Sequence, residues 1–299
     1  MQANSYNFTT TTHGKWILTG EHAVLRGSPA IIFPIASRAL TLNYQISHTS
    51  PQIEFIDNPE NEVLKTAFLA VLKRGAAIIN KPIEAICGNF YLTSNLPISA
   101  GMGASAALCV AIGRWFIWQQ WLAESELYNF ARELENLFHA ESSGADIAAC
   151  MANAGVYFKR NGEQHVINMN WQPIWFLSHC QQNSTTADCV QKVKTLWQRN
   201  PVLGQQIDKD MQRSVYLAEE ALKLEAKAGL DQLKQAIDLA CSCFVRWGLT
   251  SGKVAEHLNQ LRAAGALAVK PTGSGDGGFV LSLWQQKPPN LSLELINLS

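Results

Sequence analysis

Residues 95–107 read NLPISAGMGASAA, a proline followed by an almost unbroken run of small residues. A turn needs one glycine, yet nearly every position from Ala100 to Ala107 is Gly, Ala or Ser. The segment from Ser105 to Trp121 is apolar nearly all round at helical spacing, which predicts a buried helix. A glycine-rich loop that opens such a helix can bind anions, because its bare amides approach phosphate oxygens and the helix dipole adds positive potential. From the pattern alone, a tight loop packed under another element is an equal explanation.

Two standard nucleotide-binding patterns do not account for this chain. The P-loop pattern GxxxxGK[ST] is absent, since Lys253 is followed by valine. Residues 101–106 (GMGASA) and 273–278 (GSGDGG) both fit the dinucleotide pattern GxGxx[GA]. However, the first is followed by helix where a second strand is needed, and the second runs into a strand-like segment, FVLSLW, at 279–284. Both dinucleotide interpretations therefore fail on their context.

The composition is that of a globular protein with a large core. Of the 299 residues, 47% are apolar and 16% are charged, which argues against a disordered chain. The 24 basic residues equal the 24 acidic ones, and a net charge of zero argues against nucleic-acid binding, which needs a basic surface. The length fits one or two domains.

The cysteines and the N-terminal residues predict a cytoplasmic protein. Seven cysteines without a CxxC pair favour reduced thiols over a zinc site or a disulfide framework. The first residues, MQANSYNFTTTTHGK, contain neither the charged nor the apolar region of a signal peptide. The most apolar helical run, Ala106 to Ile112, is too short to span a bilayer. We therefore expect no association with membranes.

Strand-like and helix-like segments alternate irregularly, which favours an α+β fold over a doubly wound sheet. A change of pattern near 160–170 indicates a boundary, so we expect one domain at 1–165 and a second at 166–299. The expected strands are 15–18, 30–34, 39–45, 83–92, 155–164, 174–178 and 279–284. The expected helices are 63–79, 105–121, 124–139, 186–198, 208–228, 230–247 and 251–264.

The loop at 95–107 resembles the PxxxGLGSSAA loop of the GHMP kinases, a family named for galactokinase, homoserine kinase, mevalonate kinase and phosphomevalonate kinase. Two more segments resemble motifs of this family, in the family's order. GKWILTGEHAVLRGSPAI at 14–31 is similar to the first motif in its mevalonate kinase form, GKxxLxGEHAVVxGxPAI. KPTGSGDGG at 270–278 is similar to the third, KxTGAGGGG. Three motifs in order make the resemblance specific, and it spans nearly the whole chain.

The resemblance implies a two-domain GHMP kinase fold, with an N-terminal domain like ribosomal protein S5 domain 2 and a ferredoxin-like C-terminal domain. It also implies phosphoryl transfer from ATP, with Mg²⁺, to the hydroxyl of a small-molecule alcohol. The GEHAVL form of the first motif implies mevalonate, phosphorylated at its 5-hydroxyl in isoprenoid precursor synthesis. Phosphomevalonate kinases more often have GEYAVL.

By the same resemblance, the glycine-rich loop binds the nucleotide, and Ser105 and Glu135 bind the metal ion. Serine and glutamate oxygens suit Mg²⁺, but serine is also a common helix N-cap. Helical periodicity alone cannot choose between Glu135 and Glu133, which flank the apolar stripe of the 124–139 helix about equally. The residues implied to bind the nucleotide are Pro97, Ala100, Gly101, Gly103, Ala104, Ser105 and Ala106.

Two residues are implied to be catalytic. Asp146 ends the segment HAESSGAD, which resembles HGxPSGxD, and its carboxylate would be the base that faces the substrate hydroxyl. Lys15 of the first motif would stabilise the charge that develops on the transferred phosphate. The residues implied to contact the substrate are Glu21, His22, Thr272, Gly273 and Ser274, although His22 also fits a turn histidine.

The chain departs from the family pattern at several positions. Ala104 replaces the first serine of GLGSS, and Asp276 stands where the third motif has glycine. A carboxylate near a triphosphate is unfavourable unless it points away. STTADCVQKV at 184–193 lacks the arginine of the family segment that it weakly resembles.

These departures leave alternatives open. One is another kinase of the family, such as a phosphomevalonate kinase or a mevalonate kinase that acts on a different hydroxyl. Another is a catalytically silent nucleotide-binding regulator, although the joint presence of Lys15, Ser105, Glu135 and Asp146 favours an enzyme. A homodimer or a scaffold is also left open, because core packing explains the nine tryptophans as well as an interface does.

Overall fold

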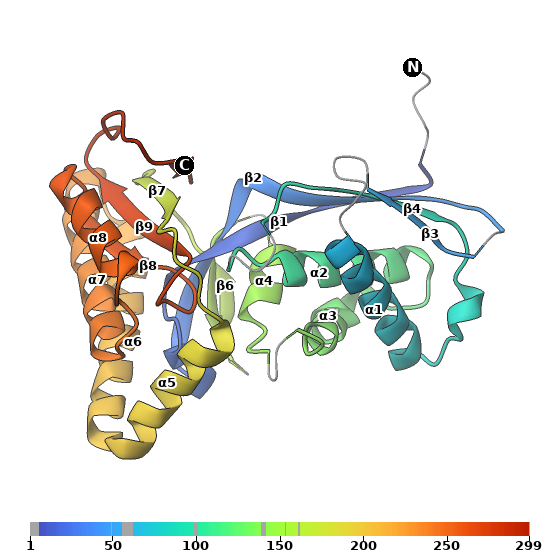
Figure 1. Ribbon diagram of the computed structural model, residues 1–299, viewed down its shortest axis with the longest axis horizontal. Helices are drawn as coiled ribbons and strands as arrows, with labels where there is room; N and C mark the ends of the chain where they lie inside the picture. Colours follow the sequence, from blue (N-terminus) through green and yellow to red (C-terminus); the bar gives the residue numbers. More distant parts are fainter. Residues whose placement is uncertain are drawn as a thin grey trace. The chain divides into compact units, whose positions relative to one another are not determined.

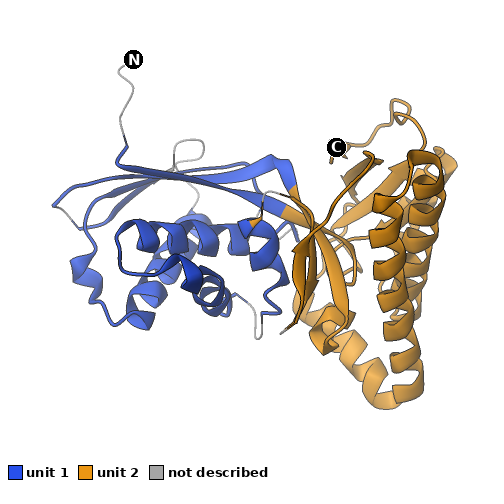
Figure 2. Ribbon diagram, turned by 180° about the vertical axis from the view of Figure 1, so that it is seen from behind, with its two compact units in different colours: residues 1–14, 35–151 blue, residues 15–34, 152–299 orange. Residues whose placement is uncertain are grey.

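The computed structural model describes residues 6–48, 50–55, 62–97, 101–138, 142–152, 154–160 and 162–298. The chain forms two compact units, which Figure 2 shows in different colours. Unit 1 comprises residues 1–14 and 35–151, and unit 2 comprises residues 15–34 and 152–299. The long strands β1 (Phe8–Thr19) and β2 (Pro29–Gln45) each contribute residues to both units. The expected domain boundary at 165/166 stays a prediction.

Unit 1 is a sheet with helices on one face (Figure 1). β2 pairs antiparallel with β4 from Leu40↔Ser94 to Gln45↔Asn89, and β3 runs parallel to β4. Besides β1 and β2, unit 1 contains β3 Gln52–Phe55, α1 Glu62–Ile78, β4 Asn89–Ser94, α2 Ala104–Trp118, α3 Leu127–Glu135 and α4 Ala145–Met151, with 3-10 helices at Ile83–Ala85 and Glu124–Glu126.

Helix α2 forms the centre of the unit 1 core, as its apolar sequence predicts. A Cβ at Gly113 would lie 2.6 Å from a Leu127 methyl carbon, so this glycine allows α3 to pack closely on α2. On the sheet side, the hydroxyl of Thr12 donates a hydrogen bond of 3.0 Å to the Ala107 carbonyl. The second of these contacts holds the start of α2, where the glycine-rich loop ends.

Unit 2 contains a four-stranded antiparallel sheet in the order β10-β7-β9-β8, with helices packed against it (Figure 1). Pro29–Ile32 of β2 pairs with β5, and β5 pairs with β6, so these strands continue the six-stranded sheet that contains β2, β3 and β4. The elements of unit 2 are the 3-10 helix Ala23–Arg26, β5 Val156–Lys159, β6 Gln164–Val166, β7 Ile174–His179, α5 Thr186–Arg199, α6 Pro201–Lys223, α7 Ala226–Arg246, α8 Lys253–Ala263, β8 Ala268–Pro271, β9 Phe279–Trp284 and β10 Ile296–Asn297.

The expected α+β class is confirmed, but some strand boundaries are wrong. The runs at 30–34 and 39–45 belong to one continuous strand, β2. The segment expected as a strand at 83–92 begins with a 3-10 helix, and its strand starts only at Asn89. Gly88 lies between them with a φ of +111°, and its left-handed conformation separates the two elements.

Two helices also differ from expectation at both of their ends. The helix expected at 208–228 is α6, which begins at Pro201 and ends at Lys223. Proline suits the first helical position, and Asn200 caps the helix by accepting a hydrogen bond of 3.1 Å from the Leu203 amide. The helix expected at 124–139 begins with a 3-10 turn, and α3 ends at Glu135.

Candidate active site

The backbone of the glycine-rich loop explains its small residues. Gly101 and Gly103 have φ values of +77° and +76°, in the left-handed region that favours glycine. Gly103 is the N-cap residue of α2, so no cap side chain covers the first amides of the helix. A helix leaves these N–H groups without intrahelical partners, and its dipole makes this end positive. The arrangement is that of an anion-binding helix terminus.

The other residues of the glycine-rich loop differ in how far their side chains are exposed to solvent. Pro97, Ala104 and Ser105 are half-buried, whereas Ala106 is fully buried. Ser105 is the second residue of α2 and not its N-cap, so the capping role considered for it is wrong. Ala100, which is implied to bind the nucleotide, lies outside the described residues.

The first motif contacts this loop through Gly14 of β1. A Cβ at Gly14 would clash with Leu96 and would lie 3.0 Å from the Met102 carbonyl oxygen. Glycine is therefore the residue that leaves room for the loop to pass β1. The first residue of the first motif thus packs against the glycine-rich loop within unit 1.

The structure distinguishes Glu135 from Glu133. Glu135 is 2% exposed at the end of α3, and its Oε2 accepts a hydrogen bond from the Ser142 hydroxyl. Glu133 instead lies at the surface, where it accepts hydrogen bonds from Arg74 and Asn136. A buried carboxylate needs charged or hydrogen-bonding partners, so Glu135 is the better candidate for a metal ligand.

Asp146 is half-buried in the first turn of α4. Gly144 before it has a φ of +83°, and a Cβ there would clash with the Tyr128 hydroxyl. One turn beyond Asp146, the Cys150 sulfur lies 3.9 Å from the Gly103 carbonyl oxygen. Because residues i and i+4 share a helix face, Asp146 lies on the face of α4 that meets the glycine-rich loop.

Unit 2 joins the first and third motifs through a buried ion pair. Glu21 and Lys270 have side chains that are 1% and 0% exposed, and Oε1 of Glu21 accepts a hydrogen bond from Lys270 Nζ. Nζ also lies 5.3 Å from the centroid of the Phe244 ring. Among the described residues, Oε2 of Glu21 has no hydrogen-bond partner. Burial raises the pKa of Glu21 and lowers the pKa of Lys270, and the charge of each partner opposes these shifts.

Lys15 is buried in β1, 4% exposed. Burial raises the pKa of Glu21. The positive charge of Lys270 lowers this pKa most, and the charge of Lys15 lowers it to a smaller extent. Two ammonium groups therefore act on one buried carboxylate. Lys270 was not identified from the sequence as a partner of Glu21, because 249 positions separate the two residues. The available signal was a lysine inside the apolar run LAVKP, where an unpaired charge would be costly.

His22 is a buried histidine that contacts the third motif. Its Nε2 lies 2.8 Å from the Ser274 carbonyl oxygen. Because a carbonyl oxygen only accepts hydrogen bonds, Nε2 carries the proton. The ring also packs edge-on to Phe244 and Trp247, with centroids 6.1 and 5.1 Å away. Burial lowers the pKa of His22 to about 4, despite the opposing effect of this hydrogen bond. At pH 7 the ring is therefore neutral, and its Nδ1 is an acceptor.

We expect His22 to make the protein less stable as the pH falls. In the unfolded chain its pKa returns to the ordinary value of 6.5, so the unfolded state takes up the proton first. The stabilisation is therefore complete above pH 6.5 and is lost towards pH 4, about 2 kcal/mol of it between pH 7.5 and pH 5. Urea unfolding at the two pH values measures this loss. His22→Gln should reduce the pH dependence, whereas exposed His48→Gln should keep it; equal dependence in both variants would contradict the assignment.

The third motif forms a loop between β8 and β9 that is bound on its inner side. The Thr272 hydroxyl accepts a hydrogen bond of 3.0 Å from the Ile17 amide and donates one of 2.9 Å to the Ile17 carbonyl. The Ser274 carbonyl accepts from His22, as described above. The Thr272 hydroxyl proton is therefore used to attach the loop to β1.

The outer side of the same loop carries free amides. Gly273 has a φ of +82° with open space beside its α-carbon, and both Gly273 and Ser274 are half-buried. Within the described part of the chain, the N–H groups of these two residues have no hydrogen-bond partner. Consecutive free amides beside a left-handed residue form an anion-binding concavity.

The predicted residues thus form one group in each unit. In unit 1, the glycine-rich loop, Glu135 and Asp146 lie on α2, α3 and α4, which pack against one another. In unit 2, Glu21 and His22 lie close to the third motif. The described ranges contain no group of three or more His, Cys, Asp or Glu side chains that could hold a metal ion. A metal ion bound by Glu135 and Ser105 would therefore need further oxygen ligands from a bound molecule.

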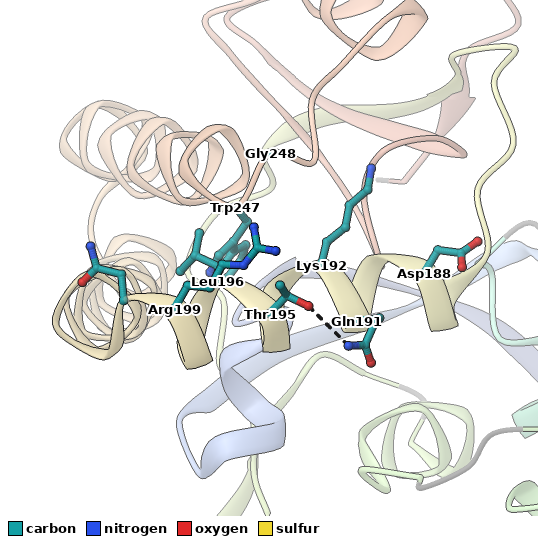
Figure 3. A pocket seen from close by; sticks show the side chains of 9 residues that line it. Asp188, Gln191, Lys192, Thr195, Leu196, Arg199, Trp247 and Gly248 are labelled. Atoms are coloured by element: carbon teal, nitrogen blue, oxygen red, sulfur yellow. Dashed lines mark hydrogen bonds between the residues drawn. The ribbon is translucent and has the colours of Figure 1, made fainter.

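Unit 2 also has an open hollow of about 730 Å³ beside α5, which Figure 3 shows. None of the residues predicted for the site lines it. Its lining consists of Asp188, Gln191, Lys192, Thr195, Leu196, Arg199, Asn200, Trp247 and Gly248.

Comparison with known proteins supports the family resemblance. Residues 62–153 match the family model described as GHMP kinases N terminal domain. This range contains the glycine-rich loop, Glu135 and Asp146. The chain is also 27% identical to the mevalonate kinase of Aeropyrum pernix, over 95% of this chain and 90% of that protein. The predicted resemblance to GHMP kinases, and among them to mevalonate kinases, is confirmed.

Solved structures share the fold. The L. major mevalonate kinase in complex with R-mevalonate has a TM-score of 0.79 and 23% identity, covering 94% of this chain and 88% of that one. The Methanococcus jannaschii mevalonate kinase has a TM-score of 0.75 and 18% identity, covering 98% of each chain. The predicted GHMP kinase fold is confirmed by these likenesses.

Proposed function

We propose that this chain, which carries a GHMP kinase N-terminal domain at 62–153, is an ATP-dependent kinase that phosphorylates the 5-hydroxyl of mevalonate. The observation that carries the proposal is the similarity to a mevalonate kinase along almost the whole chain. The GEHAVL motif at 20–25 points to the same substrate. The reaction would belong to the mevalonate pathway of isoprenoid precursor synthesis.

We assign the phosphates of ATP to the glycine-rich loop and the start of α2. Uncapped amides at the positive end of a buried helix suit a polyphosphate. The residues present also fit Mg²⁺, since the Glu135 carboxylate and the Ser105 hydroxyl are hard oxygen ligands and phosphate oxygens and water would complete the octahedron. When bound, the ion would neutralise charge on the β- and γ-phosphates.

The proposed chemistry uses Asp146 and Lys15. Asp146 accepts the proton of the 5-hydroxyl as the oxygen attacks the γ-phosphorus, and ADP leaves with the bridging oxygen and its electron pair. Lys15 stabilises the negative charge on the transferred phosphoryl group. Thr272 acts by holding the third-motif loop, because its hydroxyl proton is donated to the Ile17 carbonyl.

Substrate binding is assigned to the group of residues in unit 2. Neutral His22 offers Nδ1 as an acceptor for a substrate hydroxyl, and Glu21 offers its second carboxylate oxygen. The amides of Gly273 and Ser274 offer donors to a negatively charged group, which we assign as the phosphate group that passes from the nucleotide to the substrate. Together they suit a small molecule that carries hydroxyls and receives a phosphate group.

The two alternatives from the sequence are less well supported. Three cations of unit 2, Arg26, Lys192 and Arg246, are each paired with an aspartate, which makes them less available to a phosphorylated substrate. A silent regulator would have no need for a buried Glu135 or for Asp146 on the face of α4 that meets the loop. Both observations favour an enzyme that acts on an unphosphorylated alcohol.

We also propose that the protein works in the cytoplasm. None of the seven cysteines, all of which lie among the described residues, forms a disulfide bond, which fits a reducing compartment. Among the described helices, none has the length and apolar character needed to cross a bilayer. A homodimer, and the expected absence of nucleic-acid and membrane partners, stay predictions.

The test is a panel of alcohols with ATP and Mg²⁺, read by ADP release. We expect turnover with mevalonate, background with galactose and homoserine, and loss of turnover on removal of divalent cations with EDTA. Phosphorus NMR of the product should place the new phosphate on the 5-oxygen. If mevalonate stays at background while phosphomevalonate or another alcohol turns over, the assigned substrate is wrong; if no alcohol turns over but ATP still binds, the regulator is favoured.

A further inference from the structure

Asp276 stands in the third-motif loop where the family motif has glycine. Its φ is +54°, in the left-handed region, and the nearby Gly275 and Gly278 have φ values of +77° and +73°. Glycine would adopt this conformation without the steric cost of a side chain. The presence of aspartate at position 276, in place of glycine, must therefore be explained by the contacts of its side chain.

The carboxylate of Asp276 connects two other segments of unit 2. Its Oδ1 accepts a hydrogen bond of 2.6 Å from the Ser251 hydroxyl, in the turn before α8. Its Oδ2 accepts one from Lys192 Nζ, which extends from α5 (Figure 3). The Asp276 side chain is 13% exposed, so this ion pair is more shielded than an ordinary surface pair. Burial acts to raise the pKa of Asp276, but the hydrogen bonds from Lys192 and Ser251 outweigh it and lower the pKa.

The main chain of Asp276 is held as well. Its N–H donates to the Leu249 carbonyl at 2.7 Å, and its carbonyl accepts from Gln182 Nε2 at 2.7 Å. Gln182 in turn accepts from the Gly278 amide at 2.8 Å through its own carbonyl, and from the Lys253 amide at 3.0 Å through its side chain. The loop, the connection between β7 and α5 and the start of α8 thus form one hydrogen-bonded network.

The loop is closely packed against the interior of unit 2 at two glycines. A Cβ at Gly275 would lie 2.8 Å from the Phe244 ring, and a Cβ at Gly277 would lie 2.8 Å from the Gln182 carbonyl oxygen. The bonds from Lys192 and Ser251 to Asp276 add two attachments of the same loop to α5 and to the turn before α8.

We propose that Asp276 is a positioning residue that clamps the third-motif loop to α5 and to the turn before α8, so that the Gly273 and Ser274 amides are arranged for an anion before it binds. The inference rests on the proposed function in one respect, the identification of that anion as a phosphate group of the bound nucleotide. A loop that is already ordered loses less conformational entropy on binding, and its affinity is higher. The clamp also neutralises the carboxylate, which would otherwise disfavour a phosphate nearby.

Hydrogen–deuterium exchange on the ligand-free protein tests the clamp directly. Asp276→Gly removes both side-chain bonds and suits the left-handed φ, and we expect the amides of residues 276 and 278 to exchange about tenfold faster, the usual effect of losing a bond to a charged group. Ser251→Ala, at an exposed position that should not disturb folding, should give a smaller increase of about threefold. Asp238→Asn, which breaks the exposed pair with Lys234 in α7, is the control and should change nothing at the loop. Unchanged exchange in both Asp276→Gly and Ser251→Ala would overturn the proposal.

A double variant separates the clamp from an independent role of Lys192. Lys192→Met should loosen the loop as Asp276→Gly does, and the double variant should be no worse than the more affected single one, because both remove the same bond. Additive effects would mean that Lys192 acts on the loop or on a ligand by itself, and would overturn the clamp.

Kinetics then link the clamp to binding. With mevalonate, Asp276→Gly should raise the KM for ATP about tenfold and leave kcat within about twofold, since the chemistry is untouched. A large fall in kcat with an unchanged KM would overturn a positioning role. The exchange experiment contains no ligand, so its result holds even if mevalonate is not the substrate. In that case the dissociation constant for ADP, measured by calorimetry, replaces KM and should rise by the same factor.

Discussion

Replacing Asp146 with asparagine should lower kcat for mevalonate by roughly 10²- to 10⁴-fold, the usual range for the loss of a general base. The substitution keeps the size of the side chain and removes its ability to take up a proton. Asp146 is half-buried in the first turn of a short helix, so the fold should be retained. Nucleotide affinity should change by less than about threefold, because the substitution leaves the glycine-rich loop intact. Steady-state kinetics and ADP calorimetry measure the two quantities.

Glu133→Gln provides the matched control for this variant. It makes the same change from carboxylate to amide in the same unit, at a surface residue that pairs with Arg74. Exposed ion pairs contribute little to stability, so kcat should stay within about twofold of wild type. Equal activity in wild type, Asp146→Asn and Glu133→Gln would refute the role assigned to Asp146. A parallel loss in both variants would point to a general disturbance of unit 1.

The largest expected effect on stability is that of Lys270→Met. We expect the free energy of unfolding at pH 7 to fall by about 3–5 kcal/mol, because the change leaves the Glu21 carboxylate buried without its partner. The second oxygen of this carboxylate already lacks a hydrogen-bond partner among the described residues, and the substitution also removes the hydrogen bond to the first oxygen, so only the smaller effect of the Lys15 charge remains. Urea unfolding, followed by tryptophan fluorescence, measures the loss.

Two further variants make this measurement specific. Lys234→Met removes the same kind of side chain from an exposed pair with Asp238 and should cost no more than about 0.5 kcal/mol. Glu21→Gln combined with Lys270→Met removes both charges and should recover part of the stability, since an uncompensated buried charge is the main penalty. If Lys270→Met is as stable as Lys234→Met, the pair is not the structural element that we describe.

The three motifs could be found from the sequence because each is continuous and locally determined. Gly101 and Gly103 adopt left-handed conformations, and the apolar run that follows them forms the buried helix α2. The α+β class followed from element types that are also local signals. Expected boundaries were wrong where the signal was ambiguous, as at 83–92, where one apolar run contains a 3-10 helix and a strand.

Other decisions depended on residues that meet only in the folded chain. Periodicity placed Glu133 and Glu135 at equal distance from the apolar stripe, and burial beside Ser142 separated them. Asp276 conflicted with the family pattern until the structure placed Lys192, 84 positions earlier, against its carboxylate.

Local sequence was thus sufficient for the motifs, for the main helices and for the chemical class of the candidate site, because backbone conformation and helical periodicity are set by residues a few positions apart. It was not sufficient for the charge partners. Glu21 and Lys270 are separated by 249 positions, and neither short segment shows that their side chains share one buried space. The strength of an electrostatic interaction depends on distance and on exclusion of water, and both are properties of the tertiary structure alone.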